Sequence, residues 1–549
     1  MRVVRMVRHP ARPAAAMAAG LTLAFSFPNA GIWPLAPVGV ALLAIAVMPQ
    51  PGIARVPGRV SGRFCGRDLW RGAALGFAAG LVFFIVLLSW LLMTGIDAWL
   101  ILTVAEAAYF VPLGAGLAAL WRLPAAPVWQ ACLWVAEEAL RDRWPLGGFS
   151  WGRLAFSQSG SAFTRYASLG GAPLLTFVVA LAGGLAAVAV VRGTSIRWRT
   201  VSAACVAALA CAGLVIPLPS ANGRTVTAGI VQGNVPQLGL DFLGQAETVL
   251  NNHVQGAQRL AALVRAGKLR QPDMLIMPED ASDVDPYRDP GAYALIQSAV
   301  RDVGVPALIG TLTFTPDGHH LYNRGVVWDP RTGPGAYYDK QHLVPFGEYV
   351  PWRSLVGPYV SELQRIPYDQ QPGHRPGALR LGPATVGDVI CFEIAYDSIA
   401  RSAVTNGGQA IVVQTNNADW GLSAQPAQQL AISRLRAVEH ARPVLIAATS
   451  GISAVIAPDG RVAASTRQFS PALLDQQVRV SSARTLADQL GEAPEWILVL
   501  AGTCAAAYSV ISRRAQTSEP RPPGGTEAGT GEPGTARLGR EGSSGKQEA

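Results

Sequence analysis

The chain has 549 residues, of which 15 % are charged and 50 % are hydrophobic. Ordinary soluble domains contain about 25 % charged residues, so this composition argues against a wholly soluble enzyme and against a disordered chain. The net charge of +9 comes mostly from arginines in short segments and not from one long basic face, which argues against a nucleic-acid binder.

Apolar segments occupy the first two-fifths of the chain, and one more stands alone near the C-terminus. Several reach the roughly 20 residues that cross the hydrocarbon core of a membrane, whereas the first, second and fifth are shorter. The first could instead be a signal peptide, but further apolar segments follow at once, which favours a span. We therefore predict a polytopic α-helical membrane domain of about eight spans, at Ala14–Phe27, Ile32–Met48, Ala73–Met93, Trp99–Leu120, Ala126–Leu140, Ala167–Val191, Val201–Leu218 and Trp496–Ile511.

Arginine-rich connections set the predicted orientation, because positively charged loops stay in the cytoplasm. With eight spans, the basic N-terminus, the loops after the second and sixth spans and the residues after the last span fall on one side. Both termini are then cytoplasmic in a multi-pass protein of the plasma membrane, and the segment before the last span is extracytoplasmic. One loop breaks the rule, because it places four arginines on the outer face: Arg141, Arg143, Arg153 and Arg165.

The outer segment has a different composition from the membrane spans. Apolar runs typical of strands alternate with amphipathic helical stretches such as Ala246–Arg265 and Gln425–Arg442, which indicates an α/β domain. The C-terminal tail is rich in Gly, Pro, Glu, Ser and Thr and should be disordered. The predicted organisation is a membrane domain at 1–222, an extracytoplasmic α/β domain at 223–494, a last span at 495–514 and a cytoplasmic tail at 515–549.

A single cysteine, Cys391, lies in the predicted outer domain, and the other five lie in or beside the membrane segments. Cys391 can form no disulfide within that domain, and a lone thiol in an oxidising compartment is a liability unless it is buried or catalytic. A buried structural cysteine is the simpler interpretation. However, the thiol closes the apolar strand Val386–Cys391, where a nucleophile would be held rigidly beside a pocket.

Two further residues could serve such a thiol, which needs a base and a stabiliser of the oxyanion. Glu279 follows the apolar strand Met274–Met277 and Pro278, so its carboxylate is fixed at the strand tip as a candidate general base. Lys340 lies among aromatic and apolar residues, where its ammonium could stabilise a thiolate and a tetrahedral oxyanion. Taken alone, each could equally be a surface residue.

Other kinds of chemistry find no support in the sequence. The histidines lack the spacing of metal ligands, no glycine-rich phosphate loop occurs, and the outer domain has no Gly-x-Ser-x-Gly elbow. We therefore expect neither a metal ion nor a cofactor.

The order Glu279, Lys340, Cys391, with about sixty and fifty residues between them, resembles the Glu-Lys-Cys triad of the nitrilase superfamily. The membrane segments narrow the resemblance to the apolipoprotein N-acyltransferase family, and it extends over nearly the whole chain. The high Ala, Gly and Arg content suggests an actinobacterial-type source. The motifs that carry the resemblance are Gly147–Trp151, Val231–Gln237, His342–Glu348 and Ile390–Glu393.

The resemblance implies a nitrilase-like α-β-β-α sandwich for the outer domain, with Cys391 as nucleophile, Glu279 as general base and Lys340 as oxyanion stabiliser. It also implies that Glu348 and Glu393 shape the site, with Phe392 and Trp151 as further supporting or substrate-binding residues. The implied activity transfers a fatty acyl chain from a phospholipid, through a cysteine thioester, to the N-terminal amine of diacylglyceryl-cysteine in lipoproteins. The implied partners are phospholipid donors, diacylglyceryl-modified lipoproteins and membrane lipid.

The sequence departs from the family pattern around the implied lipid or acceptor pocket. Met277 stands where the family often has Trp, Phe392 stands where Tyr is common, and the segments Asn416–Gly421 and Pro426–Gln429 also differ. These departures bear on substrate preference more than on the triad.

The outer loop of residues 141–167 contains Trp144, Phe149 and Trp151 beside its arginines. We expect these aromatic residues to form the floor of a lipid entrance and the arginines to meet lipid phosphate. An interfacial aromatic belt is the alternative interpretation.

Two other function classes remain open at this stage. A membrane-tethered amidase of the same fold would use water as the acceptor and needs a wet pocket, whereas acyl transfer needs an apolar one facing the bilayer. A non-enzymatic envelope scaffold would not need the three triad residues together. A transporter is disfavoured, because membrane-embedded acids such as Glu106 and Glu137 are few and the spans show no inverted repeat.

Overall fold

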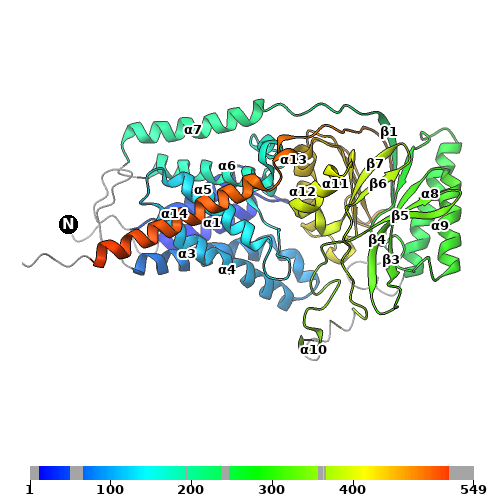
Figure 1. Ribbon diagram of the computed structural model, residues 1–549, viewed down its shortest axis with the longest axis horizontal. Helices are drawn as coiled ribbons and strands as arrows, with labels where there is room; N and C mark the ends of the chain where they lie inside the picture. The colour runs from blue at the N-terminus through cyan, green and yellow to red at the C-terminus, as the bar shows by residue number, and fades with distance from the viewer. Residues whose placement is uncertain are drawn as a thin grey trace, which may run out of the picture.

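The computed structural model describes residues 11–49, 66–191, 194–235, 246–356, 363 and 366–518. A bundle of apolar helices lies at one end of its long axis and an α/β domain at the other (Figure 1). The basic N-terminus and the tail beyond Ser518 lie outside the described residues.

Each predicted apolar segment is helical in the structure. Five of the helices within the described residues are long and apolar enough to cross a membrane, and α1, α2 and α5 are shorter, with 15, 13 and 16 residues. The number of spans therefore stays a prediction. The helices are α1 (Ala11–Phe25), α2 (Leu35–Val47), α3 (Gly66–Leu87), α4 (Ile96–Leu120), α5 (Ala126–Arg141), α6 (Ala167–Val190), α7 (Ile196–Val215) and α14 (Ala493–Ser518).

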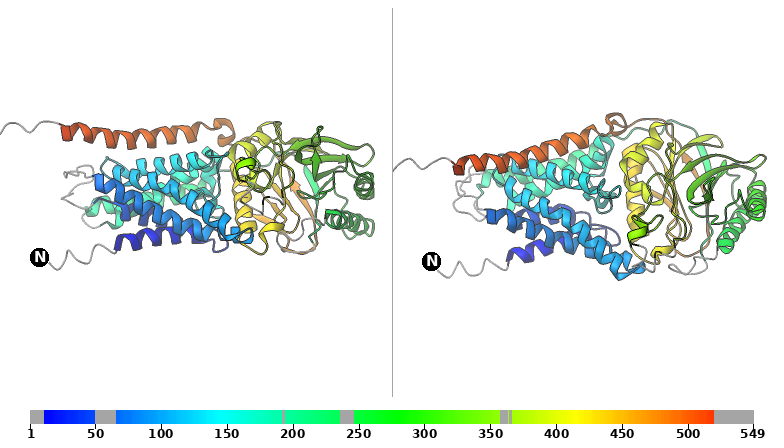
Figure 2. Two further views of the ribbon diagram at one scale, coloured as in Figure 1. Left: turned by 90° about the horizontal axis from the view of Figure 1, so that it is seen from below. Right: turned by 60° about the horizontal axis from the view of Figure 1, so that its bottom comes forward.

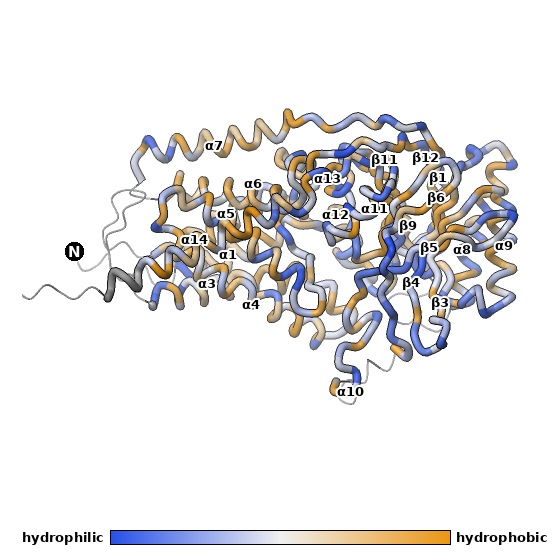
Figure 3. The backbone as a smooth tube through the Cα atoms, viewed as in Figure 1, coloured by the Kyte–Doolittle hydropathy of each residue, from blue (hydrophilic) through white to orange (hydrophobic). Residues whose placement is uncertain are grey.

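Apolar residues predominate along the helices of the bundle, whereas polar and apolar residues alternate in the α/β domain (Figure 3). The start of α1 and the end of α14 both lie at the end of the bundle away from the α/β domain (Figure 2). An arrangement with both termini on one side of a membrane and the α/β domain on the other fits this geometry.

Two six-stranded sheets face each other in the α/β domain. The order is β12-β1-β2-β3-β4-β5 in the first sheet and β11-β10-β9-β8-β7-β6 in the second. The strands are β1 (Thr225–Gln232), β2 (Met274–Ile276), β3 (Ala307–Phe314), β4 (Leu321–Asp329), β5 (Gly333–Asp339), β6 (Ala378–Leu381), β7 (Ala384–Ile390), β8 (Ala410–Thr415), β9 (Val444–Ala448), β10 (Ala454–Ile456), β11 (Val462–Ser465) and β12 (Ala472–Arg479).

Helices cover both outer faces of the sheet pair, so the domain is the expected α-β-β-α sandwich. Helices α8 (Ala246–Arg265) and α9 (Pro290–Val303) pack against the first sheet, where Leu260 and Ile296 join its buried core. Helices α11 (Asp397–Thr405) and α12 (Gln425–His440) cover the second sheet and lie between it and the membrane bundle (Figure 1). The central strands β7, β8 and β9 are almost wholly buried, as apolar runs of this kind predict.

Polar contacts and a continuous apolar core join the membrane bundle to the α/β domain. Gln428 of α12 donates from Nε2 to the carbonyl oxygens of Pro28 (3.1 Å) and Leu87 (3.3 Å), and its Oε1 accepts from Trp151 Nε1 at 2.6 Å. One buried cluster contains Phe83 and Trp151 from the bundle side together with Ile394 from the α/β domain. The junction is therefore a packed interface and not a flexible tether.

The arginines of the loop 141–167 do not have the role expected from the sequence. Arg141 is 1 % exposed and pairs with Glu106 (3.4 Å) and Glu137 (3.1 Å), which also gives these two membrane acids a structural partner. Arg153 is 2 % exposed and pairs with Glu138, Asp142 and Asp397. The expectation that Arg141 and Arg153 meet lipid phosphate is wrong, because buried carboxylates already neutralise them. Both arginines pair inside the protein, which the loop-charge rule does not consider.

Arg153 connects the membrane loop to the nucleophile's neighbourhood through Asp397 at the start of α11. Asp397 accepts from Arg153 (2.9 Å) and from Arg436 of α12 (2.7 Å). Burial raises the pKa of Asp397, but Arg153, Arg436 and Arg401 outweigh it and hold that pKa well below its usual range. Arg436 also donates to the carbonyl oxygens of Ile394 and Ala395, at the end of the short helical turn that begins at Cys391.

Replacing Arg153 with alanine should cost about 3–5 kcal/mol of unfolding free energy, because three buried carboxylates lose their partner. Arg143→Ala is the matched control, since Arg143 pairs with Glu495 but is 41 % exposed, so its loss should cost about 1 kcal/mol or less. Thermal unfolding of both full-length variants in detergent measures the difference. Equal midpoints for the two variants would show that the buried pair does not hold the domains together.

Candidate active site

The three predicted triad residues come from both sheets and meet at one end of the sandwich. Glu279 follows β2 and Lys340 follows β5 in the first sheet, whereas Cys391 follows β7 in the second. Lys340 Nζ lies 3.0 Å from Glu279 Oε1. The charges of both residues act on the Cys391 thiol, so the sequence-predicted set is brought together in the structure.

Cys391 begins a tight helical turn, η8 (Cys391–Ala395), directly after β7. The strand ends one residue earlier than the sequence predicts, because Cys391 has a φ of 54° and cannot continue it. A non-glycine residue in this left-handed region is strained and persists only where its surroundings hold it. The backbone N–H of Phe392 has no helical acceptor at the start of this turn, so it remains a candidate donor to an oxyanion.

The Glu279 carboxylate is buried and held by three donors. It is 3 % exposed, and Oε1 accepts from Lys340 Nζ and from Asn323 Nδ2 at 2.8 Å. Its other oxygen, Oε2, accepts from the backbone N–H of Asn416 at 2.7 Å. These contacts fix the orientation of the carboxylate, as a general base requires.

Lys340 is 1 % exposed and lies between two carboxylates. Its Nζ donates to Glu348 at 2.6 Å in addition to Glu279. Burial lowers the pKa of Lys340, but the two carboxylates outweigh burial and hold it well above its usual range. The ammonium is therefore a permanent positive charge beside the nucleophile.

The Cys391 thiol is partly exposed and receives a hydrogen bond from the Thr415 hydroxyl, with 3.3 Å between Oγ1 and Sγ. Burial raises the pKa of this thiol well above its usual range and Glu279 raises it further, while Lys340 and Thr415 offset only part of this. One cation facing two carboxylates leaves the site net negative, which disfavours a resting thiolate. A Cys391 thiol that reacted as a nucleophile would therefore have to lose its proton in the reaction, and Glu279 is the candidate to accept it.

Glu393 has a structural role behind the triad. Its carboxylate is 0 % exposed and accepts from the backbone N–H groups of Ile390, Gln341 and His342, and from the Tyr338 hydroxyl. Burial raises the pKa of Glu393 to about 7, although these donors oppose it. Glu393 thus joins the turn that carries Cys391 to the segment that carries Lys340.

Aromatic rings from the loop and from the α/β domain form an apolar wall beside Cys391. Phe392 stacks on Phe149 and Trp151 of the membrane loop, with ring centroids 5.6 and 5.8 Å apart. Trp151 is only 2 % exposed, so it lies beneath this wall and not at its surface. His342 packs on Tyr396 at 3.6 Å and completes the wall.

Replacing His342 with phenylalanine should reduce the acid sensitivity of the fold. Burial and then Lys340 lower the pKa of His342 to about 4, whereas the unfolded chain binds a proton near the ordinary value of about 6.5. The stability that this group contributes is therefore present above that value and is lost as the pH falls toward 4. The drop in the thermal unfolding midpoint from pH 7 to pH 5 should be smaller in His342→Phe than in the unsubstituted chain.

The exposed His374 supplies a matched control, and His374→Phe should leave that drop unchanged. An equal drop in the His342→Phe variant would refute this account of the buried imidazole.

Sequence reasoning missed the polar residues that orient the triad. Asn323 of β4 donates to both Glu279 and Glu348, Thr415 contacts the thiol, and Gln429 of α12 donates to the Cys391 carbonyl oxygen at 3.1 Å. Asn416 follows Thr415, in a segment that the sequence analysis noted only as a departure from the family pattern. These residue types are common in strands and turns, so only the pairing of the strands distinguishes them.

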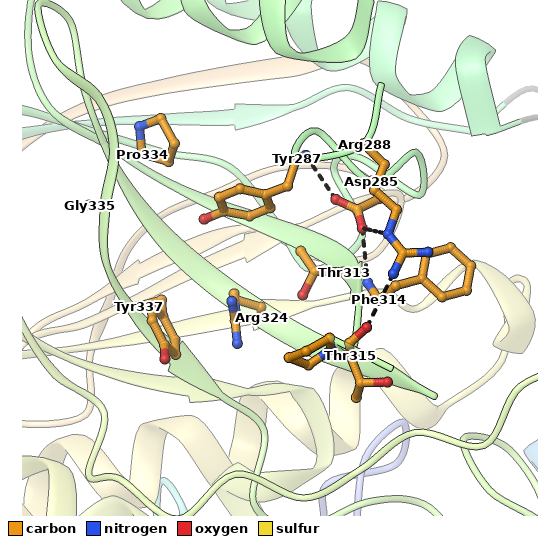
Figure 4. Close-up of a pocket in the computed structure, with 11 residues that line it drawn as sticks. Asp285, Tyr287, Arg288, Thr313, Phe314, Thr315, Arg324, Pro334, Gly335 and Tyr337 are labelled. Atoms are coloured by element: carbon orange, nitrogen blue, oxygen red, sulfur yellow. Dashed lines mark hydrogen bonds and ion pairs between the residues drawn. The ribbon is translucent and has the colours of Figure 1, made fainter. Parts of the chain in front are cut away.

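A cavity of about 480 Å³ lies elsewhere in the domain, over the outer face of the first sheet (Figure 4). Arg288, Arg324 and Tyr337 are among its lining residues, and no triad residue lines it. Arg324 is paired with Asp339 through two contacts of 2.5 and 2.9 Å. We therefore place the candidate active site at the triad and not at this cavity. Within the described ranges, no group of His, Cys, Asp and Glu side chains is arranged to hold a metal ion.

Comparisons with known proteins cover both parts of the chain. The family model for the apolipoprotein N-acyltransferase N-terminal domain matches residues 19–185, and the carbon-nitrogen hydrolase model matches residues 243–488. An apolipoprotein N-acyltransferase of Mycolicibacterium smegmatis is 37 % identical over 522 residues, covering 90 % of this chain and 85 % of the relative. One of Geobacter metallireducens is 28 % identical, covering 90 % and 94 %. A solved amidase from Nesterenkonia sp. is similar at 17 % identity and a TM-score of 0.36, covering 50 % of this chain and 96 % of the amidase.

Proposed function

The chain belongs to the apolipoprotein N-acyltransferase family of membrane enzymes that act in lipoprotein maturation, and we propose that Cys391 carries the acyl group between its two substrates. The observation that carries this proposal is the Glu279–Lys340 pair beside Cys391, at the junction with the membrane helices. A phospholipid is the proposed donor, and the N-terminal amine of a diacylglyceryl-modified lipoprotein is the proposed acceptor.

In the first half-reaction, Cys391 Sγ attacks the carbonyl carbon of a phospholipid ester while Glu279 accepts the thiol proton. Lys340 Nζ and the backbone N–H of Phe392 stabilise the oxyanion that forms. The carbon–oxygen bond then breaks, Glu279 returns the proton to the alkoxide, and lysophospholipid leaves. The product is a thioester between the fatty acyl chain and Cys391.

In the second half-reaction, the lipoprotein amine attacks the thioester carbonyl carbon. Glu279 accepts a proton from the attacking nitrogen, the carbon–sulfur bond breaks, and the thiolate regains a proton as the amide forms. A thioester suits this step, because amines attack it readily and the two lipid substrates need never be bound together.

The apolar surroundings of Cys391 support a lipid donor over a small polar amide. Phe392 and the stacked rings of Phe149 and Trp151 border the nucleophile, and Trp420 packs on Trp90, in the short turn after α3, with centroids 4.7 Å apart. Bringing each methylene of an acyl chain into water costs about 0.8 kcal/mol. A site at the membrane surface avoids that cost for both substrates.

We further propose that the α/β domain is extracytoplasmic and that both termini are cytoplasmic, in a chain of about eight spans divided at residues 222, 494 and 514. The charge of the loops supports this orientation, and so does the position of the ends of α1 and α14 away from the α/β domain. Labelling of single cysteines introduced at Gly267 and Thr194 with a membrane-impermeant reagent tests it. The account predicts labelling in intact cells at Gly267 and not at Thr194, and the reverse pattern would overturn the orientation.

The activity is tested by incubating detergent-purified protein with phosphatidylethanolamine and a diacylglyceryl-cysteine peptide. The peptide should gain one acyl chain on its amine, and double-reciprocal plots at several donor concentrations should be parallel, as expected when one substrate leaves before the other binds. Release of free fatty acid without N-acylation would show that water and not the amine takes the acyl group, which contradicts the proposed transfer, whereas hydrolysis of a small amide without phospholipid turnover would favour the membrane-tethered amidase. No turnover of any phospholipid would favour a scaffold and contradict the proposed chemistry.

A further inference from the structure

The buried carboxyl group of Asp388 has no part in the chemistry proposed above. Asp388 lies on β7, in the strand that leads to Cys391, and is 0 % exposed. Neither of its carboxyl oxygens meets a hydrogen-bond donor among the residues that the structure describes. An ionised carboxylate is strongly destabilised in such a position, because it has lost water and gained no partner.

A second orphaned acceptor lies at the same place. Gln414 of β8 is 0 % exposed, and its Nε2 donates to the carbonyl oxygen of Met277 at 2.6 Å, but its Oε1 has no donor. A Cβ atom added to Gly325 of β4 would lie 2.1 Å from Asp388 Oδ2 and 2.6 Å from Gln414 Oε1. Asp388 Oδ2 and Gln414 Oε1 therefore converge on Gly325, a strand position that has no side chain.

We propose that Asp388 is a protonated, neutral carboxylic acid that donates its hydrogen to Gln414 Oε1, and that this pair positions the general base Glu279. One proton on Asp388 Oδ2 gives that oxygen and Gln414 Oε1 a partner at once, because the acid becomes a donor and the amide oxygen accepts it, and the neutral acid leaves no charge on Oδ1. Two facing acceptors without that proton would repel each other.

Gln414 connects Asp388 to the active site through its hydrogen bond to Met277. Its bond to the Met277 carbonyl oxygen joins the second sheet to the end of β2, just before Pro278 and Glu279. Thr415, the last residue of the same strand, donates to Cys391 Sγ, and the backbone N–H of Asn416, directly after the strand, donates to Glu279. A shift of Gln414 would therefore move the base relative to the nucleophile, so Asp388 is a positioning residue.

Electrostatics agrees with this geometry. Burial raises the pKa of Asp388 and the Glu393 carboxylate raises it further, with a smaller contribution from Glu279. The nearby backbone N–H of Val389 opposes them without completing a hydrogen bond to either carboxyl oxygen, and the pKa of Asp388 still lies well above its usual range. Burial and then Glu393 raise the pKa of Tyr338 well above its usual range, with a smaller contribution from Asp388, so the Tyr338 hydroxyl keeps its proton.

Infrared difference spectroscopy of the full-length protein tests the proton directly. Subtracting the spectrum of Asp388→Asn from that of the unsubstituted chain should leave a carbonyl band of a protonated carboxylic acid. Asp285→Asn is the matched control and should leave that band unchanged, because Asp285 already accepts from the backbone N–H groups of Tyr287 and Phe314. A carboxylate band in place of the acid band would overturn the proposal.

The positioning role, which rests on the proposed function, is tested by the rate of acyl-Cys391 formation from phosphatidylethanolamine. Asparagine also presents a donor to Gln414, so Asp388→Asn should keep the rate within about threefold, whereas Asp388→Leu should lower it about tenfold with unchanged KM. If Asp388→Asn formed acyl-Cys391 as slowly as Asp388→Leu, the positioning role of Asp388 would be contradicted. If the unsubstituted chain forms no acyl-enzyme, the proposed function fails, while the infrared band still decides the state of Asp388.

Discussion

Cys391→Ala removes acyl transfer completely, to below about 10⁻⁴ of the rate of the unsubstituted chain, because no other group can form the covalent intermediate. The structure offers no substitute within the described residues, since the other described cysteines lie in the membrane bundle. Thr415 contacts the thiol, but nothing in its surroundings activates the hydroxyl as a nucleophile. N-acylation of a diacylglyceryl-cysteine peptide, followed by mass spectrometry, measures the effect.

The matched control for Cys391→Ala is Cys504→Ala, which removes an exposed thiol from α14. It should transfer acyl groups at the unsubstituted rate. Because the alanine at position 391 is smaller than the thiol and the site is partly exposed, Cys391→Ala should also unfold at nearly the unsubstituted temperature. Residual transfer of more than about 1 % by a folded Cys391→Ala protein would contradict covalent catalysis by this residue.

Lys340→Met lowers kcat on the order of 10²–10³-fold, because the oxyanion loses its nearest positive charge. The KM for the phospholipid should change much less, since the charge acts on the transition state more than on the bound ester. The same change leaves Glu279 and Glu348 facing each other without a cation, and Glu348 now accepts only from Val344 and Asn323. Unfolding should therefore also become easier.

Lys268→Met is the control for this variant, because Lys268 is exposed on the far side of the domain. It should change neither kcat nor the unfolding midpoint. To separate chemistry from folding, kcat is measured at a temperature where Lys340→Met is fully folded. A Lys340→Met protein that is folded and within threefold of the unsubstituted kcat would exclude Lys340 as the oxyanion stabiliser.

The sequence identifies the parts of the structure that depend on local pattern. Apolar length predicts the helices of the bundle, and the alternation of apolar strands and amphipathic helices predicts the α/β domain. For these elements the signal lies within a few residues. The sequence also offers Glu279, Lys340 and Cys391 as candidates, but only their order, which resembles the nitrilase triad, joins them into one site.

What the sequence could not predict depends on contacts between distant segments. Arg153 and Asp397 are far apart in the chain, and nothing near either of them indicates that each neutralises the other. The expectation that the loop arginines meet lipid phosphate therefore failed for Arg141 and Arg153, since their partners lie on α4, α5 and α11. Asn323 likewise reaches Glu279 only because β4 pairs with β3, whose other neighbour is β2.

The turn at Cys391 also depends on contacts between distant segments. The strand Val386–Cys391 expected from the sequence ends at Ile390, because Glu393 accepts the Ile390 N–H and the chain turns at Cys391 with a positive φ. No residue in the pattern marks this turn, since cysteine has no preference for that conformation. The strain at Cys391 is held by Glu393 and Gln429, which belong to the folded site and not to the local sequence.

The most direct test of the account is the mass of the intact protein after incubation with phosphatidylethanolamine and no acceptor. We predict a gain of one fatty acyl group, its removal by hydroxylamine, its location on the peptide that contains Cys391, and its transfer to a diacylglyceryl-cysteine peptide added later. An intact chain that turns over phospholipid but never carries an acyl group on Cys391 would contradict the account.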